Sequence, residues 1–289
     1  MTTGERALAM WPLLASEVLI FGTAIFVLLI APAGDSDEAM AEALAPLWRG
    51  LATLAFVISP IVLLVDAAAM ANVALVQTIP VIPEVMLGTH LGRTWLWSFP
   101  VTAILAAVAW RPGGHRLKSA ALALLAGTLL LAGSLSSHAI DHGALAVAIY
   151  FIHEAAAALW VGAILGLWLE VARGTRGPDW MRRTCPRVSR VAGWAVVVLI
   201  LSGLYTAYLA LGLDPDRLIY AAYGRILVVK VCAAGLVLLI GAYNRYWLIP
   251  TIAKPSSQAA LLRNVGLESA LLIGVIGLAA LLANTPPAH

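Results

Sequence analysis

Charged residues are scarce in this chain. Asp, Glu, Lys and Arg make up 11% of its 289 residues, against roughly 25% in a typical soluble domain. A soluble domain of this length needs a charged surface, and the chain has too little charge to form one. Hydrophobic residues make up 62% and fall in long unbroken runs, which are typical of a chain whose solvent is lipid. The net charge of +3 therefore gives no indication of nucleic-acid binding.

Several chemical motifs are also missing. The two cysteines, Cys185 and Cys232, are too few for a disulfide framework, and neither lies in a C-x-x-C or a zinc-type spacing with histidine. The six methionines include no M-x-x-M run, which argues against a thioether pathway for Cu(I). Walker and G-x-S-x-G motifs are absent from the sequence, so ATP hydrolysis and serine chemistry have no support. We expect a protein that is not an enzyme.

Eight segments are long and apolar enough to cross a bilayer, since a helical span needs about 20 mostly apolar residues. They cover approximately residues 11–31, 46–70, 94–111, 117–138, 145–171, 189–212, 223–247 and 260–283. The first run is too long for the apolar part of a signal peptide, so we interpret it as a membrane helix. We predict an all-α, eight-helix transmembrane bundle that forms a single membrane domain over residues 1–289. In it, residues 1–115 hold the first three helices and residues 116–289 hold the other five.

Lys and Arg are distributed unequally between the two ends of this bundle. The N-terminus and the connections on its side carry only four: Arg6, Arg93, Arg217 and Arg225. The connections after the first, third, fifth and seventh helices carry Arg49, Arg111, Arg116, Lys118, Arg173, Arg176, Arg182, Arg183, Arg187, Arg190, Arg245, Lys254 and Arg263. Connections rich in Lys and Arg stay in the cytoplasm. We therefore predict a bacterial inner-membrane protein with both termini in the periplasm.

The histidines gather on the predicted periplasmic side. His90 follows the second helix, His138 and His142 flank the turn between the fourth and fifth helices, and His289 lies at the C-terminus. His153 lies about 12 Å below the outer end of the fifth helix, at 1.5 Å per residue. Only His115 lies on the cytoplasmic side, where a role in a solvated loop suffices. Imidazole is a good copper ligand, so this asymmetry predicts a metal site.

The candidate ligands differ in how strongly they indicate function. His138 and His142 are four residues apart, which places them on one face if the turn is helical, although interfacial histidines also form ordinary hydrogen bonds. The position of His153 indicates a functional role, because an ionisable side chain inside a membrane span is energetically costly. Asp66, near the outer end of the second helix, is either a direct ligand or a partner of one. The predicted metal ligands are His90, His138, His142, His153 and Asp66.

Several sequence elements resemble, in order and spacing, those of the copper resistance protein D (CopD/PcoD) family. The elements are SSHAIDHG, YFIHEAAAALWVGAILGLW, YGRILVVK, NRYWLIP and GLESALLIGVIGLAALLANTPPA. The resemblance covers about residues 120–289, and it matches His138 and His153 to family histidines. It also implies structural roles for Tyr223, Gly224, Arg225, Lys230, Asn244, Arg245, Pro250 and Glu268.

This resemblance implies a multi-spanning inner-membrane protein of copper uptake or copper resistance that works beside a periplasmic copper-binding partner. Together with the histidine pattern, it predicts copper capture at the outer end of the bundle. Imidazole and carboxylate ligands favour Cu(II) over Cu(I). Two alternatives stay open: an electron-transfer protein that holds b-type haem between facing histidines, and an assembly factor that hands copper to a partner enzyme.

Overall fold

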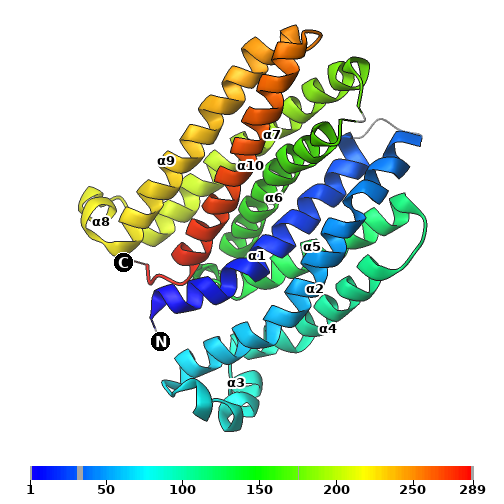
Figure 1. Ribbon diagram of the computed structural model, residues 1–289. Helices are drawn as coiled ribbons and strands as arrows, with labels where there is room; N and C mark the ends of the chain where they lie inside the picture. The colour runs from blue at the N-terminus through cyan, green and yellow to red at the C-terminus, as the bar shows by residue number, and fades with distance from the viewer. Residues whose placement is uncertain (1, 31–34, 175, 288–289) are drawn as a thin grey trace.

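The computed structural model describes residues 2–30, 35–174 and 176–287. Within these ranges eight helices are long and apolar enough to cross a membrane, which confirms the predicted all-α bundle (Figure 1). The long helices are α1 (Thr3–Ile25), α2 (Asp35–Ala71), α4 (His90–Trp110), α5 (His115–Leu135), α6 (Ala144–Ala172), α7 (Pro178–Leu211), α9 (Ala222–Tyr243) and α10 (Pro255–Ala283).

Shorter helical elements lie between or extend these spans. Two are π-helical turns that continue a long helix, η1 (Phe26–Ile30) after α1 and η5 (Asn244–Leu248) after α9. The others are η2 (Leu75–Gln77), η3 (Ile79–Val81), α3 (Ile82–Gly88), η4 (His138–His142), α8 (Pro215–Tyr220) and η6 (Ile249–Thr251).

Three helices begin well before the apolar runs that predicted them. α1 begins at Thr3 rather than near residue 11, because Thr2 and Glu5 form a reciprocal capping box that starts the helix in polar sequence. α2 begins at Asp35 rather than near residue 46, and α7 begins at Pro178 rather than near residue 189. An apolar run marks the part of a helix that lies in lipid, and these helices continue beyond it.

α1 and α6 form the centre of the bundle. Their backbones cross in contact, because a Cβ atom on Gly162 of α6 would lie 2.0 Å from the carbonyl carbon of Gly22 in α1. One turn further along α6, Gly166 leaves room for the ring of Phe26, where a Cβ atom would lie 2.5 Å from the ring. Small residues at such crossings let membrane helices approach closely. α6 also packs against α5, α7 and α10, so at least four helices contact it.

α9 lies at the edge of the bundle, where it packs mainly against α10 and α8 (Figure 1). It exposes large apolar side chains that include Val229, Leu236 and Leu239. A helix that satisfies its own backbone hydrogen bonds can present such side chains to lipid. These residues therefore form part of the lipid-facing surface.

The antiparallel order of the spans defines two ends of the bundle. The start of α1, the end of α2, α3, η4, α8 and the end of α10 lie at one end, here named the η4 end (Figure 1). The start of α2, the start of α5, the end of α6 and the start of α7 lie at the opposite end. Helices from both sides of residue 115 pack together, as α1 does against α5, α6 and α10. The division of the membrane domain at that residue stays a prediction.

Candidate metal site

His138 and His142 lie at the two ends of η4, and both are exposed. The turn begins where the Ser137 hydroxyl accepts a hydrogen bond from the Ala139 amide at 3.2 Å, and it ends at Gly143, whose φ is 90°. η4 is a 3₁₀ turn rather than an α-helical one. Three residues per turn separate side chains four apart by about 120°, so the two imidazoles do not share the single face that α-helical spacing predicts.

His153 lies nine residues into α6, about 14 Å along the helix axis from its start at Ala144. Its Nδ1 lies 3.0 Å from the Oγ of Ser202 in α7. The ring rests against Gly203, where a Cβ atom would lie 3.3 Å from the Cε1 of His153. The side chain is therefore held between α6 and α7, within one span and below the exposed histidines of η4.

Glu154 faces a different neighbour, as its position one residue further around α6 predicts. Its Oε2 accepts a hydrogen bond from the Ser134 hydroxyl of α5 at 2.9 Å. Glu17 of α1 and Lys230 of α9 lie within electrostatic range of the same carboxylate. Lys230 also lies within electrostatic range of His153. Ionisable side chains of α1 and α9 thus lie within electrostatic range of Glu154 in α6, in a region where intramembrane charge is costly unless it is paired.

Asp66, another predicted ligand, already has a cationic partner. Its Oδ1 accepts hydrogen bonds from Nη2 and Nε of Arg6 at 3.0 and 3.3 Å. This pair joins α1 and α2 at the η4 end. A metal ion would have to compete with the guanidinium for the carboxylate, so the contact gives Asp66 a structural role that the sequence pattern did not indicate.

His90 is the first residue of α4, and its imidazole is exposed at the η4 end. The hydroxyl of Thr89 caps the same helix by accepting from the Gly92 amide at 2.9 Å. His289 lies outside the described residues. All five predicted ligands are therefore at or below the η4 end, but no three of them bring ligand atoms within 4.8 Å of one another in the described part of the chain.

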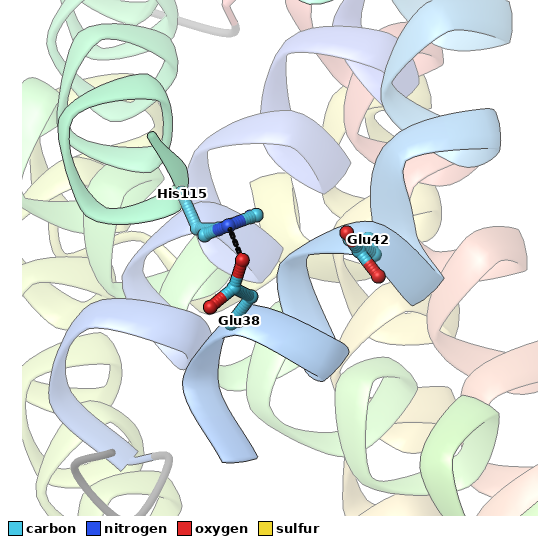
Figure 2. Close-up of side chains that lie close together, drawn as sticks. All are labelled: Glu38, Glu42 and His115. Carbon is cyan, nitrogen blue, oxygen red and sulfur yellow. Dashed lines mark hydrogen bonds and ion pairs between the residues drawn. The ribbon is translucent and has the colours of Figure 1, made fainter. Parts of the chain in front are cut away.

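The group that does converge to that distance in the described residues is Glu38, Glu42 and His115, shown in Figure 2. Glu38 and Glu42 lie one turn apart near the start of α2, and His115 is the first residue of α5. The Nε2 of His115 lies 2.5 Å from the Oε1 of Glu38. Two carboxylates and an imidazole are ligand types that bind Cu²⁺ or Zn²⁺, and His115 and Glu38 already contact each other without a metal.

This group lies at the end opposite η4, where sequence reasoning assigned His115 a solvated loop role. Glu38 and His115 are 77 residues apart along the chain, and only the packing of α2 beside α5 brings them together. One feature of the sequence could have indicated this group: Glu38 and Glu42 are four residues apart and therefore share a helix face.

Other buried polar residues have partners that fix helix packing. Glu170 of α6 lies 2.6 Å from Arg176 and 3.3 Å from Arg173. Glu268 of α10 accepts from the side-chain amide of Asn244, whose Oδ1 accepts from Asn264 at 2.9 Å. These contacts leave Glu268 paired with asparagine, whereas Lys230 lies near Glu154. Lys230 and Glu268 therefore belong to separate networks, as expected from their different depths along helices α9 and α10.

Comparison with known proteins gives matches along most of the chain. The family described as Copper resistance protein D matches residues 182–282, and the family described as Copper resistance protein D-like, N-terminal domain matches residues 6–146. No solved structure matches the chain.

Three curated proteins are similar to this chain. Copper transport protein CutJ of Bacillus subtilis is 29% identical over 164 residues, which cover 55% of this chain and only 29% of that protein. Inner membrane protein YebZ of Escherichia coli is 27% identical over 216 residues, 72% of this chain and 73% of that protein. Copper resistance protein D of Pseudomonas syringae is 22% identical over 289 residues, 93% of each chain.

Proposed function

The chain belongs to the copper resistance protein D family, and on that premise we propose that this multi-pass inner-membrane protein carries copper across the membrane. One observation supports the proposal most strongly: an imidazole lies inside a span below two exposed imidazoles at the same end. His138 and His142 lie in η4, and His153 follows in the helix that begins directly after it. This order provides successive ligands for an ion that enters from the η4 end.

The η4 end is proposed to face the periplasm. The end opposite it carries the basic residues of the first turns of α7, including Arg182, Arg183 and Arg187, and such residues stay in the cytoplasm. Copper would then arrive at η4 from the periplasm. The exposure of this turn also suits delivery by a periplasmic copper-binding protein, which is the proposed partner.

The five candidate ligands take different parts in this proposal. His138 and His142 capture the ion at the surface, and His90 is exposed at the same end of the bundle. His153 receives it within the bundle. Asp66 can contribute only when Arg6 releases it, so its first role is to hold α1 against α2. Imidazole donors with a carboxylate suit Cu(II) better than Cu(I).

Uptake by purified protein in sealed vesicles tests this function. We expect copper to accumulate with the wild-type protein and accumulation to be lost in His138→Ala/His142→Ala. Asp141→Asn is a matched control, since it alters the exposed residue between them without removing an imidazole. Copper binding without accumulation would contradict transport and would instead favour a protein that hands copper to a partner.

A further inference from the structure

The hydroxyl of Ser202 makes three contacts that together determine where its proton lies. Its Oγ lies 2.6 Å from the carbonyl oxygen of Val198 and 3.4 Å from that of Leu199, both earlier in α7, and 3.0 Å from the Nδ1 of His153. A serine hydroxyl has one proton to donate and lone pairs with which to accept. Both carbonyl oxygens can only accept, so the Ser202 proton is donated to the backbone, at the shorter contact with Val198.

His153 must then be the donor in its contact with Ser202. With the hydroxyl proton directed at Val198, the Oγ presents a lone pair to Nδ1, and Nδ1 carries the hydrogen. In an uncharged imidazole only one ring nitrogen is protonated. The Nε2 of His153 therefore has a free lone pair, which is the form that a metal ion requires.

We propose that Ser202 is a positioning residue, which holds His153 as the Nδ1–H tautomer and leaves Nε2 available to coordinate copper. The copper part of this inference rests on the proposed function. Metal-binding histidines generally donate their second ring N–H to a neighbouring oxygen, which fixes both the tautomer and the orientation of the ring. Ser202 supplies that oxygen from a different helix.

The packing around Ser202 and His153 also holds the imidazole ring with its Nδ1 toward the serine. Ser202 is buried, so water does not replace its hydroxyl as the acceptor. Gly203 follows it, and a Cβ atom there would lie 3.3 Å from the Cε1 and 3.7 Å from the Nδ1 of His153. Those distances indicate that the ring lies against the backbone of α7, with Nδ1 beside the serine.

The tautomer can be measured without copper. Full-length protein with ¹⁵N-labelled histidine rings is purified, stripped of metal with a chelator and examined by ¹⁵N NMR, with His153 assigned from its loss in His153→Gln. We expect a protonated Nδ1 and an unprotonated Nε2 in the wild type and in Ser202→Thr, which keeps the hydroxyl. We expect a mixture of tautomers in Ser202→Ala. A protonated Nε2 in the wild type, or an unchanged spectrum in Ser202→Ala, would overturn the inference.

Copper titration of the same variants tests the consequence for binding. Removing the second partner of a ligating histidine typically weakens metal affinity by roughly 10- to 100-fold. We expect that loss in Ser202→Ala and wild-type affinity in Ser202→Thr. Thr206→Ala is the matched control, because the Thr206 hydroxyl lies one turn along α7 and bonds only to the Gly203 carbonyl at 3.1 Å among the described residues.

The two measurements separate this inference from the proposed function. If NMR shows the expected tautomer and no variant binds copper, the proposed function fails and so does the copper role of Ser202, while the tautomer assignment stands. If copper binds and Ser202→Ala binds it as tightly as the wild type, the proposed function survives and the positioning role is overturned.

Discussion

The guanidinium of Arg6 donates two hydrogen bonds to one oxygen of Asp66, at 3.0 and 3.3 Å, and so joins the first span to the second at the η4 end. The contact gives Asp66 a structural role as a helix clamp, and its role as a metal ligand stays a prediction.

Substitution of either member of this pair tests the clamp. We expect Arg6→Gln and Asp66→Asn each to lower the stability of the folded protein by about 1 kcal/mol, the size of a partly exposed charged contact. The double variant should lose no more than the larger single loss, because the interaction is removed only once. Thermal unfolding in detergent measures this. Additive losses, or loss of bound copper in Asp66→Asn alone, would show that Asp66 acts independently of Arg6.

Replacement of Gly162 tests the crossing of α1 and α6. A Cβ atom at this position would lie 2.0 Å from the backbone of Gly22, so Gly162→Ala must separate the two helices. Overpacking of this kind typically costs 1–3 kcal/mol, about the range we expect. Gly274→Ala is the matched control, because a Cβ atom there meets nothing within 4 Å. Equal unfolding temperatures for the two variants would contradict the close crossing.

Much of the fold could be predicted from the sequence, because lipid imposes a simple length and polarity requirement on each span. The positions of the eight spans followed from apolar runs. The helix starts did not, since α2 and α7 continue through charged sequence where no apolar signal marks them. The capping box of Thr2 and Glu5, which starts α1, can be recognised in the sequence, but it does not indicate where the membrane span begins.

The side-chain contacts of the candidate site were less predictable. The sequence shows that His153 lies inside a span. It does not show that Ser202, 49 residues away, is its partner, because identifying that partner requires knowing how α6 packs on α7. The convergence of His115 with Glu38 depends in the same way on how α5 meets α2. Spacing along one helix could be evaluated from sequence, whereas the rotation of one helix against another could not.

The charges near His153 predict a coupled pair. Lys230 and Glu154 lie within electrostatic range of each other inside the bundle. Removing one charge leaves the other inside the bundle without its oppositely charged neighbour, so we expect Lys230→Met and Glu154→Gln each to lower the unfolding temperature of the protein. The combined variant should be more stable than either. A combined loss equal to the sum of the single losses would show that the charges are not paired.

The proposed orientation can be examined by cysteine labelling. In a background of Cys185→Ser and Cys232→Ser, we expect Asp141→Cys, in exposed η4, to react with a membrane-impermeant maleimide added from the periplasmic side. Lys254→Cys, exposed near the start of α10 at the opposite end, should react only after the membrane is opened. The reverse pattern would place η4 in the cytoplasm and invert the proposed path.

The most direct test of the central claim, that copper binds at the histidines of the η4 end, is the copper content of the detergent-purified protein after copper loading and desalting. Wild-type protein is compared with His138→Ala/His153→Ala, and His115→Ala serves as the control from the opposite end. We expect near-stoichiometric copper in the wild type and in the control, and its loss in the double variant. Copper absent from all three proteins, or retained in the double variant, would contradict the assignment.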